Sequence, residues 1–322
     1  MSAVLEVGGL HVSFGRLEAV RGIDLEIASG ETHCLVGESG CGKSATALAI
    51  MRLLPGGARQ RASFIHFDGE DIAGIPERRM RRLRGDRIAM IFQEPMTSLN
   101  PAYTIGSQMT EVLRAHRGTQ RADAAERAEA MLARVGVSAP SMRLGQFPHQ
   151  LSGGLRQRVM IATALLCEPE LVIADEPTTA LDVTVQAGIL RLLNDLKRDL
   201  GLAILLITHD LGVVARVADT VSVMYAGEIV ERGPVAALFA APNHPYTRGL
   251  LRAVPVPGRT RRGEMLAAIP GMVPRIEAGF RGCGFRDRCG QALAACAQPV
   301  GLQWEGAHSW RCRLAAGWKE AA

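Results

Sequence analysis

The chain has 322 residues, of which 48% are hydrophobic and 21% charged, and its formal net charge is +5 at pH 7. These values are typical of an ordinary globular protein and exclude a disordered or fibrous chain. The length predicts one large α/β domain with room for a smaller appendage. The positive charge does not by itself indicate nucleic acid, because the arginines are spread along the chain apart from a cluster at 78–84 that is typical of a solvated helix face.

The apolar runs are too short to cross a bilayer, which takes about 20 residues. The run 202–207, for example, has the length of a strand. The N-terminal segment 1–15 lacks the basic stretch, apolar run and cleavage site of a secretory signal, so we expect a cytoplasmic chain. Four of the seven cysteines lie in the last 40 residues, and a reducing compartment makes disulfides an unsuitable explanation for this clustering.

The first elements in chain order are short strands separated by glycine turns, ending in an apolar strand over 32–36. A glycine-rich loop follows and leads into a predicted helix over 44–54. Between 108 and 135 apolar residues recur at three- and four-residue spacing, which predicts a helical insertion.

Two buried strands are predicted next, at 171–174 and 203–207, with a helix over 183–200 between them. This alternation is the order of a parallel sheet. Prolines then recur from Pro234 to Pro274, so that only short elements fit there. We therefore place a domain boundary near residue 240.

The glycine-rich loop reads G-E-S-G-C-G-K-S and fits the phosphate-binding pattern G-x4-G-K-[ST] between a strand and a helix. Glycines allow successive backbone N–H groups to point at phosphate oxygens, and the helix N-terminus adds partial positive charge. We expect Lys43 to reach the β- and γ-phosphates of ATP and Ser44 to ligate Mg²⁺. The predicted nucleotide-binding residues of the loop are Gly37, Ser39, Gly40, Cys41, Gly42, Lys43 and Ser44.

The strand over 171–174 ends in two carboxylates, Asp175 and Glu176. Carboxylates at the end of a parallel strand suit a metal and an activated water. We expect Asp175 to bind the Mg²⁺ shell and Glu176 to polarise the attacking water. Two surface carboxylates that cap the next helix are the plainer alternative.

The sequence L-S-G-G-L-R-Q-R at 151–158 resembles the signature motif of the ABC ATPase family. A phosphate-binding loop alone fits many nucleotide hydrolases, whereas a Ser-Gly-Gly helix start shortly before the aspartate strand is similar only to this family. The resemblance implies that Ser152, Gly153 and Gly154 bind the γ-phosphate held by the opposite subunit. Two chains would then make two sites.

Further matches follow in family order over residues 1 to about 235. Gln93 resembles the Q-loop glutamine, which implies a role in catalysis and in the Mg²⁺ shell, and His209 resembles the switch histidine. Ala180-Leu181-Asp182 resembles the D-loop, with Asp182 near the nucleotide. Phe14 resembles the aromatic residue that stacks on adenine, although a core phenylalanine is an open alternative. Cys41 stands where serine is common. Its place before a helix N-terminus predicts a reactive thiolate, although an inert side chain that points into the packing is an open alternative.

The tail resembles that of oligopeptide and dipeptide importer ATPases through N-H-P-Y-T-R-G-L-L at 243–251 and Ile-Pro-Gly at 269–271. A cysteine array follows. Its members are Cys283, Cys289, Cys296 and Cys312. In some relatives this array is understood to hold an iron–sulfur cluster, so we expect one [4Fe–4S] cluster. Tetrahedral zinc and free thiols remain open from the residues alone, although C-x2-C spacing is absent.

Together these features predict a RecA-like α/β core with an N-terminal antiparallel β portion, a helical subdomain at about 96–165 and a small domain at 241–322. The resemblance implies an ATPase subunit that drives uptake of di- or oligopeptides, or of related small solutes, through two separate membrane permease subunits.

It also implies a second ATPase subunit, with a heterodimer favoured over a homodimer, and an extracytoplasmic solute-binding protein. The expected location is the cytoplasmic face of the inner membrane, without nucleic acid as a partner. A soluble ABC-type ATPase that acts on nucleic acid or the ribosome is the alternative.

Overall fold

The computed structural model describes residues 2–93, 98–178, 182–254 and 268–314. The chain divides into two compact units, each of which is described by itself. Unit 1 comprises Met1–Val4, Ile27–Glu31 and Gly74–Leu206. Unit 2 comprises Leu5–Glu26, Thr32–Ala73 and Ile207–Ala322, so it holds both the glycine-rich loop and the tail.

One sheet of unit 2 is the predicted antiparallel β portion. Its strands are β1 (Ala3–Phe14), β2 (Leu17–Ala28), β4 (Ala58–Arg61), β5 (Phe64–Phe67) and β6 (Glu70–Asp71). The first two residues of β1 and the last two of β2 belong to unit 1. Their order is β2-β1-β5-β6, with β4 paired to β1. Leu10 and Val12 of β1 are buried, while the side chains between and beyond them are partly exposed. This alternation is the pattern of a sheet with one face on a core.

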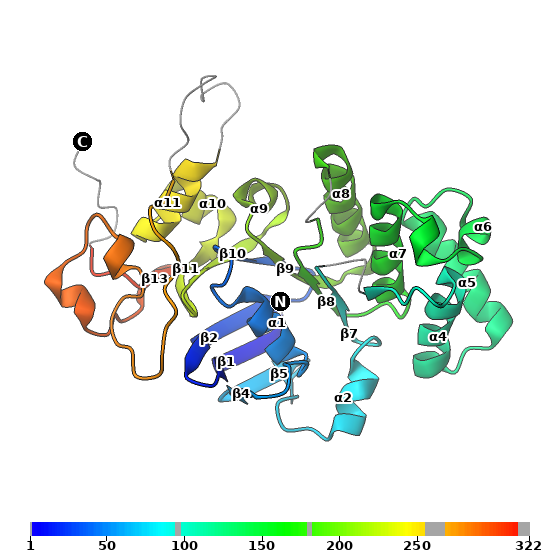
Figure 1. Ribbon diagram of the computed structural model, residues 1–322, viewed down its shortest axis with the longest axis horizontal. Helices are drawn as coiled ribbons and strands as arrows, with labels where there is room; N and C mark the ends of the chain where they lie inside the picture. The colour runs from blue at the N-terminus through cyan, green and yellow to red at the C-terminus, as the bar shows by residue number, and fades with distance from the viewer. Residues whose placement is uncertain (1, 94–97, 179–181, 255–267, 315–322) are drawn as a thin grey trace. The chain divides into compact units, whose positions relative to one another are not determined.

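A second run of strands in unit 2 extends from the glycine-rich loop to the tail. The order is β12 (Gln303–Glu305), β13 (His308–Trp310), β11 (Glu228–Pro234), β10 (Thr220–Tyr225) and β3 (Thr32–Val36). Parallel pairing joins β10 to β3, and antiparallel pairing joins β11 to β10 and to β13. Strand β13, near the red end of the described tail in Figure 1, is therefore hydrogen-bonded to β11, and only β10 separates β11 from β3, the strand before the glycine-rich loop.

The helices of unit 2 are short. They are α1 (Lys43–Ile50), α9 (Leu211–Val217), α10 (Val235–Ala240), α11 (Pro245–Ala253) and the 3-10 turns η2 (Arg286–Arg288) and η3 (Ala294–Ala297). Among the described residues beyond 240, the longest element is α11 with nine residues, as the proline-rich sequence predicts.

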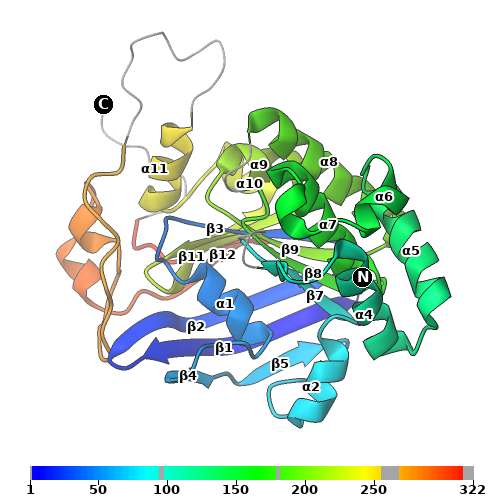
Figure 2. The same ribbon diagram turned by 45° about the vertical axis from the view of Figure 1, so that its right-hand side comes forward.

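Unit 1 contains a helical bundle and strands of a parallel sheet. Its elements are α2 (Glu77–Leu83), β7 (Ile88–Ile91), α4 (Ile105–Arg117), α5 (Arg121–Arg134), α6 (Pro140–Leu144), η1 (Pro148–Gln150), α7 (Gly153–Leu165), β8 (Leu171–Asp175), α8 (Val183–Leu200) and β9 (Ala203–Thr208), whose last two residues belong to unit 2. Strand β8 pairs in parallel with β7 and lies beside β9. Helices α4 to α7 form the bundle (Figures 1 and 2).

The predicted elements correspond closely to these. The strands over 32–36, 171–174 and 203–207 are β3, β8 and β9, and the helix over 183–200 is α8. The helical insertion is interrupted, because α4 ends at Gly118 in the left-handed conformation, with φ 62°, before α5 begins.

The mixed α/β class is confirmed. Within the described parts of the chain, no helix is long and apolar enough to span a membrane. The predicted subdomain at 96–165 begins at two residues outside the described ranges, and its limits and the boundary near residue 240 stay predictions.

Candidate active site

The glycine-rich loop follows β3, all of whose five residues are buried, and it lies close to neighbouring backbone in unit 2. A side chain at Gly37 would place its Cβ 2.1 Å from the carbonyl oxygen of Met224, and one at Gly42 would place it 2.2 Å from that of Ala19. Gly42 also has φ 111°. Only glycine fits at these two positions, since any side chain would collide with backbone.

Lys43 is the first residue of α1 and is 5% exposed. Its ammonium group donates to the carbonyl oxygens of Gly37, at 2.8 Å, and Glu38, at 3.0 Å. No side chain within the described residues caps the start of α1. A phosphate would therefore meet helix N–H groups, the helix dipole and the lysine at one place.

Three other residues of the loop are exposed to solvent. Ser39, Gly40 and Ser44 are exposed, and a Cβ added to Gly40 would meet no atom within 4 Å. The Ser44 hydroxyl at the helix start has the chemistry to ligate Mg²⁺, which prefers oxygen ligands. The residues of this loop thus suit the phosphates of ATP and one ligand of its metal ion.

The predicted reactive thiolate at Cys41 is wrong. Cys41 is fully buried, and burial raises the pKa of its thiol, with the nearby Lys43 only partly opposing the shift. Its sulfur lies 3.8 Å from the lysine Nζ. The side chain points into the packing under the loop, where the charged form is disfavoured.

Two further predicted residues of unit 2 lie at strand ends. Phe14 ends β1 and is 37% exposed, which removes the alternative of a core phenylalanine. His209 follows β9 and is exposed. Asp210 after it caps α9 by accepting from the backbone N–H of Gly212 at 2.7 Å.

In unit 1 the carboxylates lie at the end of β8, as predicted. Asp175 is 5% exposed and ends the fully buried strand. Glu176 follows with φ 46°, a left-handed conformation that costs a non-glycine residue about 1–3 kcal/mol. The Gln93 amide donates to the Glu176 carboxylate at 3.1 Å. The structure therefore brings together two of the residues to which we assigned roles in hydrolysis.

The signature sequence forms the start of α7 in unit 1. Ser152 is the N-cap and accepts from the backbone N–H of Leu155 at 3.4 Å. Ser152 and Gly153 are exposed, and a Cβ at Gly154 would approach Val185 of α8 at 3.1 Å. An exposed serine at an N-cap presents N–H groups and a hydroxyl to an anion.

The described part of the predicted D-loop is a helix cap. Asp182 is exposed and caps α8 by accepting from the backbone N–H of Val185 at 2.9 Å. Ala180 and Leu181 of the same motif lie outside the described residues. The cap accounts for an aspartate at this position without a ligand, so the predicted nucleotide contact stays a prediction.

The four tail cysteines line one small cavity in unit 2. The backbone N–H of Cys283 donates to the carbonyl oxygen of Cys296 at 2.9 Å. Burial raises the pKa of Cys283 to about 11, and the other three thiols add to the shift. Burial likewise raises the pKa of Cys312. The sequence separates these thiols by up to 29 positions, and the fold gathers them.

A single metal ion is not matched by this arrangement. Across the described ranges, no group of three or more His, Cys, Asp or Glu side chains has the geometry to hold one metal ion. Four thiolates around one zinc would each lie about 2.3 Å from it. Among the described residues, therefore, neither the expected iron–sulfur cluster nor the zinc alternative has a preformed site.

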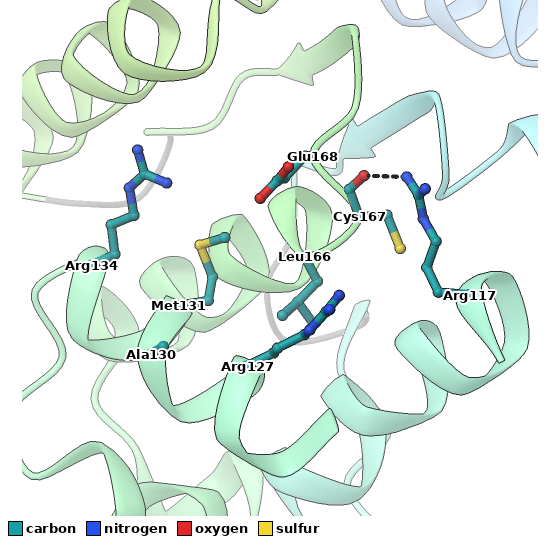
Figure 3. A pocket seen from close by; sticks show the side chains of 8 residues that line it. All are labelled: Arg117, Arg127, Ala130, Met131, Arg134, Leu166, Cys167 and Glu168. Carbon is teal, nitrogen blue, oxygen red and sulfur yellow. Dashed lines mark hydrogen bonds between the residues drawn. The ribbon is translucent and has the colours of Figure 1, made fainter. Parts of the chain in front are cut away.

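A pocket of about 430 Å³ in unit 1 was not expected from the sequence. It lies among α4, α5 and the end of α7 and contains three arginines, Arg117, Arg127 and Arg134 (Figure 3). Arg117 donates to the carbonyl oxygen of Cys167 at 2.7 Å and pairs with Asp86 at 2.8 Å. Arg134 pairs with Asp199, which does not line the pocket, at 3.4 Å. Since two of the three arginines already have carboxylate partners, we assign no ligand to this pocket.

One residue of the glycine-rich loop and two residues that contact it were not singled out from the sequence. Glu38 is a variable position of the loop pattern, and Tyr246 and Arg288 lie in the tail. Tyr246 and Arg288 both hydrogen-bond Glu38. The only available signal was their position inside the tail motifs.

Comparison with known proteins agrees with this geometry. Residues 20–179 match the ABC transporter family, and residues 230–296 match the oligopeptide/dipeptide transporter C-terminal region. A putative peptide import ATP-binding protein of Brucella melitensis is 52% identical over 91% of each chain. The oligopeptide transport ATP-binding protein OppD of Salmonella typhimurium is 48% identical over 92% of this chain and 88% of its own.

Solved structures show the same fold. CbiO1 of Clostridium perfringens, part of the ABC transporter complex CbiONQ, is 27% identical with a TM-score of 0.64, over 74% of this chain and 92% of its own. The ATP-binding cassette MJ0796, in a dimer bound to ADP and phosphate, is 26% identical with the same TM-score, over 72% of this chain and 98% of its own. The predicted fold is confirmed, and the chain belongs to the ABC transporter family of ATPases, with the C-terminal region of its oligopeptide/dipeptide transporters.

Proposed function

We propose that this chain is the ATP-hydrolysing subunit of an importer that carries peptides, or related small solutes, through separate membrane permease subunits. The observation that carries the proposal is the combination in one chain of an ABC cassette with the oligopeptide/dipeptide transporter C-terminal region. Relatives at 48% to 52% identity over about nine-tenths of the chain bear peptide import or transport names. Nothing in these findings favours action on nucleic acid or the ribosome.

ATP binding is assigned to the loop of unit 2. The backbone N–H groups of the loop and of the first turn of α1 would cradle the phosphates, and Lys43 would move from the loop carbonyls to the β- and γ-phosphates. The exposed Phe14 would stack on adenine. Ser44 and Asp175, with the Gln93 side-chain oxygen, would hold Mg²⁺, which neutralises developing phosphate charge when bound.

Hydrolysis is assigned to Glu176, Gln93 and His209. The Glu176 carboxylate would accept a hydrogen bond from the attacking water and orient it. Gln93, which donates to that carboxylate at 3.1 Å, fixes its position. His209 would donate to the phosphate as charge develops there. The left-handed backbone at Glu176 supports this assignment, because strain of this kind gathers at active sites.

Assembly follows from the signature. Ser152, Gly153 and Gly154 would bind the γ-phosphate held by a second ATPase subunit, and Asp182 would lie near the same interface. A similar but distinct partner chain, two permease subunits on the membrane and an extracytoplasmic solute-binding protein complete the proposed importer. The chain would then act at the cytoplasmic face of the membrane.

We also propose that Cys283, Cys289, Cys296 and Cys312 ligate a [4Fe–4S] cluster. Their convergence on one cavity supports this. A cluster is larger than one ion and is held by four thiolates. Its role would be structural, since a tail of short elements buries little apolar surface.

Peptide uptake in the cell of origin tests the proposed function. Deleting the gene should abolish uptake of at least one labelled di- or oligopeptide, and the wild-type chain should restore it. A chain with Glu176→Gln, expressed at the same level, should not. Unchanged uptake of every peptide in the deletion strain, together with ATPase activity stimulated by nucleic acid, would overturn the proposal in favour of the alternative.

A further inference from the structure

Glu38, the second residue of the phosphate-binding loop, has each of its polar groups held by another side chain. Its backbone N–H donates to the Tyr246 hydroxyl at 2.9 Å. Its carbonyl oxygen accepts from Lys43 at 3.0 Å, and its carboxylate oxygens accept from Arg288 at 3.1 and 3.0 Å. Two of these three partners come from the tail, more than 200 positions away in sequence.

Arg288 is itself fixed in place. Its Nε donates to the carbonyl oxygen of Pro270 at 2.7 Å, and its Nη2 donates to that of Ile269 at 3.1 Å. The side chain is 7% exposed, and the guanidinium lies 5.7 Å from the ring centre of Tyr225. A guanidinium with this many fixed partners presents a rigid charge to Glu38, which a flexible surface ion pair would not do.

Tyr246 is anchored as firmly. Its side chain is fully buried, with ring centres 4.5 Å from Tyr225 and 5.4 Å from Phe285. It lies in the first turn of α11, where the His244 side chain accepts from its backbone N–H at 3.1 Å. Burial raises the pKa of the Tyr246 phenol, so its hydroxyl stays neutral and keeps accepting from Glu38.

We propose that Arg288 and Tyr246 are positioning residues of the ATP site, which act through Glu38. Before ATP binds, Lys43 helps to hold the start of the loop by bonding the carbonyls of Gly37 and Glu38. When Lys43 turns to the phosphates those bonds are lost. The Glu38 carbonyl then still accepts from the backbone N–H of Cys41 at 3.3 Å, and the two tail residues are the side-chain contacts that keep Glu38 in place. They pre-organise the loop, so less free energy is spent on ordering it as ATP binds.

This inference rests on ATP binding by the chain and needs neither the peptide substrate nor the iron–sulfur cluster. A purely structural role for the same contacts would be to dock the tail. The two roles differ in their readout. Docking alone predicts lower stability with unchanged nucleotide affinity, whereas positioning predicts weaker ATP binding in a folded chain with little change in turnover at saturating ATP.

The test measures the Kd of the purified full-length chain for ATP by calorimetry, and KM and kcat of the assembled transporter. Arg288→Gln should raise Kd and KM about tenfold, equivalent to about 1.4 kcal/mol, and leave kcat within about twofold. Tyr246→Phe keeps the ring packing and removes the acceptor of the Glu38 N–H, so it should raise Kd about fivefold. Arg288→Lys, which keeps the charge, should recover part of the loss.

Two comparisons separate positioning from general damage. Arg275→Gln removes the same charge from an exposed position of the same tail and should leave Kd unchanged. In a Glu38→Gln background, Arg288→Gln should have less effect than in the wild type, because both act through one contact. An unchanged Kd in folded Arg288→Gln, or an equal loss in Arg275→Gln, would overturn the proposal. If Arg288→Gln does not fold, Tyr246→Phe and Glu38→Gln decide it, and an unchanged Kd in both rejects it.

Discussion

Glu231 offers a severe test of how the tail is attached to the rest of unit 2. It lies on β11 and is fully buried. Its carboxylate accepts from the backbone N–H groups of Asn243, at 2.6 Å, and His244, at 2.9 Å, and from the His308 ring at 2.8 Å. One side chain thus connects a core strand to the start of α11 and to β13.

Glu231→Ala leaves these three donors buried without an acceptor. Each such group costs about 1–3 kcal/mol, while removal of the carboxylate relieves its own desolvation. The net loss should be about 3–4 kcal/mol in the free energy of unfolding of the tail. Glu231→Gln keeps one acceptor oxygen, so its loss should be smaller, at about 1–2 kcal/mol.

Tryptophan fluorescence during urea unfolding measures this loss, because all three tryptophans of the chain lie in the tail at 304, 310 and 318. Trp310 lies two residues after His308 on β13, with the two ring centres 5.4 Å apart, and is 2% exposed. Glu305→Ala, at an exposed position of β12, is the matched control and should leave the transition within about 0.5 kcal/mol. A Glu231→Ala chain whose fluorescence transition matches that of the control would refute the reasoning.

Three further predictions address the proposed chemistry. Glu176→Gln should bind ATP normally but hydrolyse it about 10²–10⁴-fold more slowly, because the amide cannot polarise the water, whereas Lys43→Ala should weaken ATP binding itself. Turnover and the Kd for ATP, measured side by side in the assembled transporter, check both results. Near-normal turnover of the glutamine variant would show that Glu176 does not activate the water. Ser152→Arg should impair hydrolysis of the nucleotide on the partner subunit and leave the ATP affinity of its own loop intact. Equilibrium ATP binding to the isolated full chain measures that affinity, and its loss would contradict a site shared between chains. Cys289→Ser should abolish the iron and sulfide content of anaerobically purified protein. Because Arg288 directly precedes Cys289, the same change should also weaken ATP binding. Stoichiometric zinc without iron in the wild-type protein would contradict the cluster.

The local chemistry of the site could be predicted from the sequence because its motifs are contiguous. The loop from Gly37 to Ser44 is fixed by one strand, one turn and one helix start, so a short pattern specifies it. The carboxylates at the end of β8 follow from a buried apolar run in the same way. The contact between Gln93 and Glu176 was not predicted, since no local pattern places residues 83 positions apart at 3.1 Å.

Long-range packing is what the sequence could not supply. The need for glycine at position 37 depends on the carbonyl of Met224, which belongs to a neighbouring strand. The same packing buries Cys41 and reverses the expected thiolate, because desolvation outweighs the attraction of Lys43. The contact between Arg288 and Glu38 spans 250 positions, and no periodicity encodes it.

The boundary predicted near residue 240 separates the sequence motifs of the ATPase from those of the tail, but many side-chain contacts cross it. Every motif of the ATPase lies before it, yet the residues after it complete the surroundings of the loop. Without them, Glu38 would lose the Tyr246 acceptor and the Arg288 charge, and the buried Glu231 carboxylate would lose all three of its described donors. An unpaired buried carboxylate destabilises the fold, so a cassette ending at residue 240 would have to reorganise β11. Strand β11 pairs with β10, which pairs with β3, the strand before the glycine-rich loop. The tail therefore forms part of the packing around the phosphate-binding loop and is more than an appendage to it.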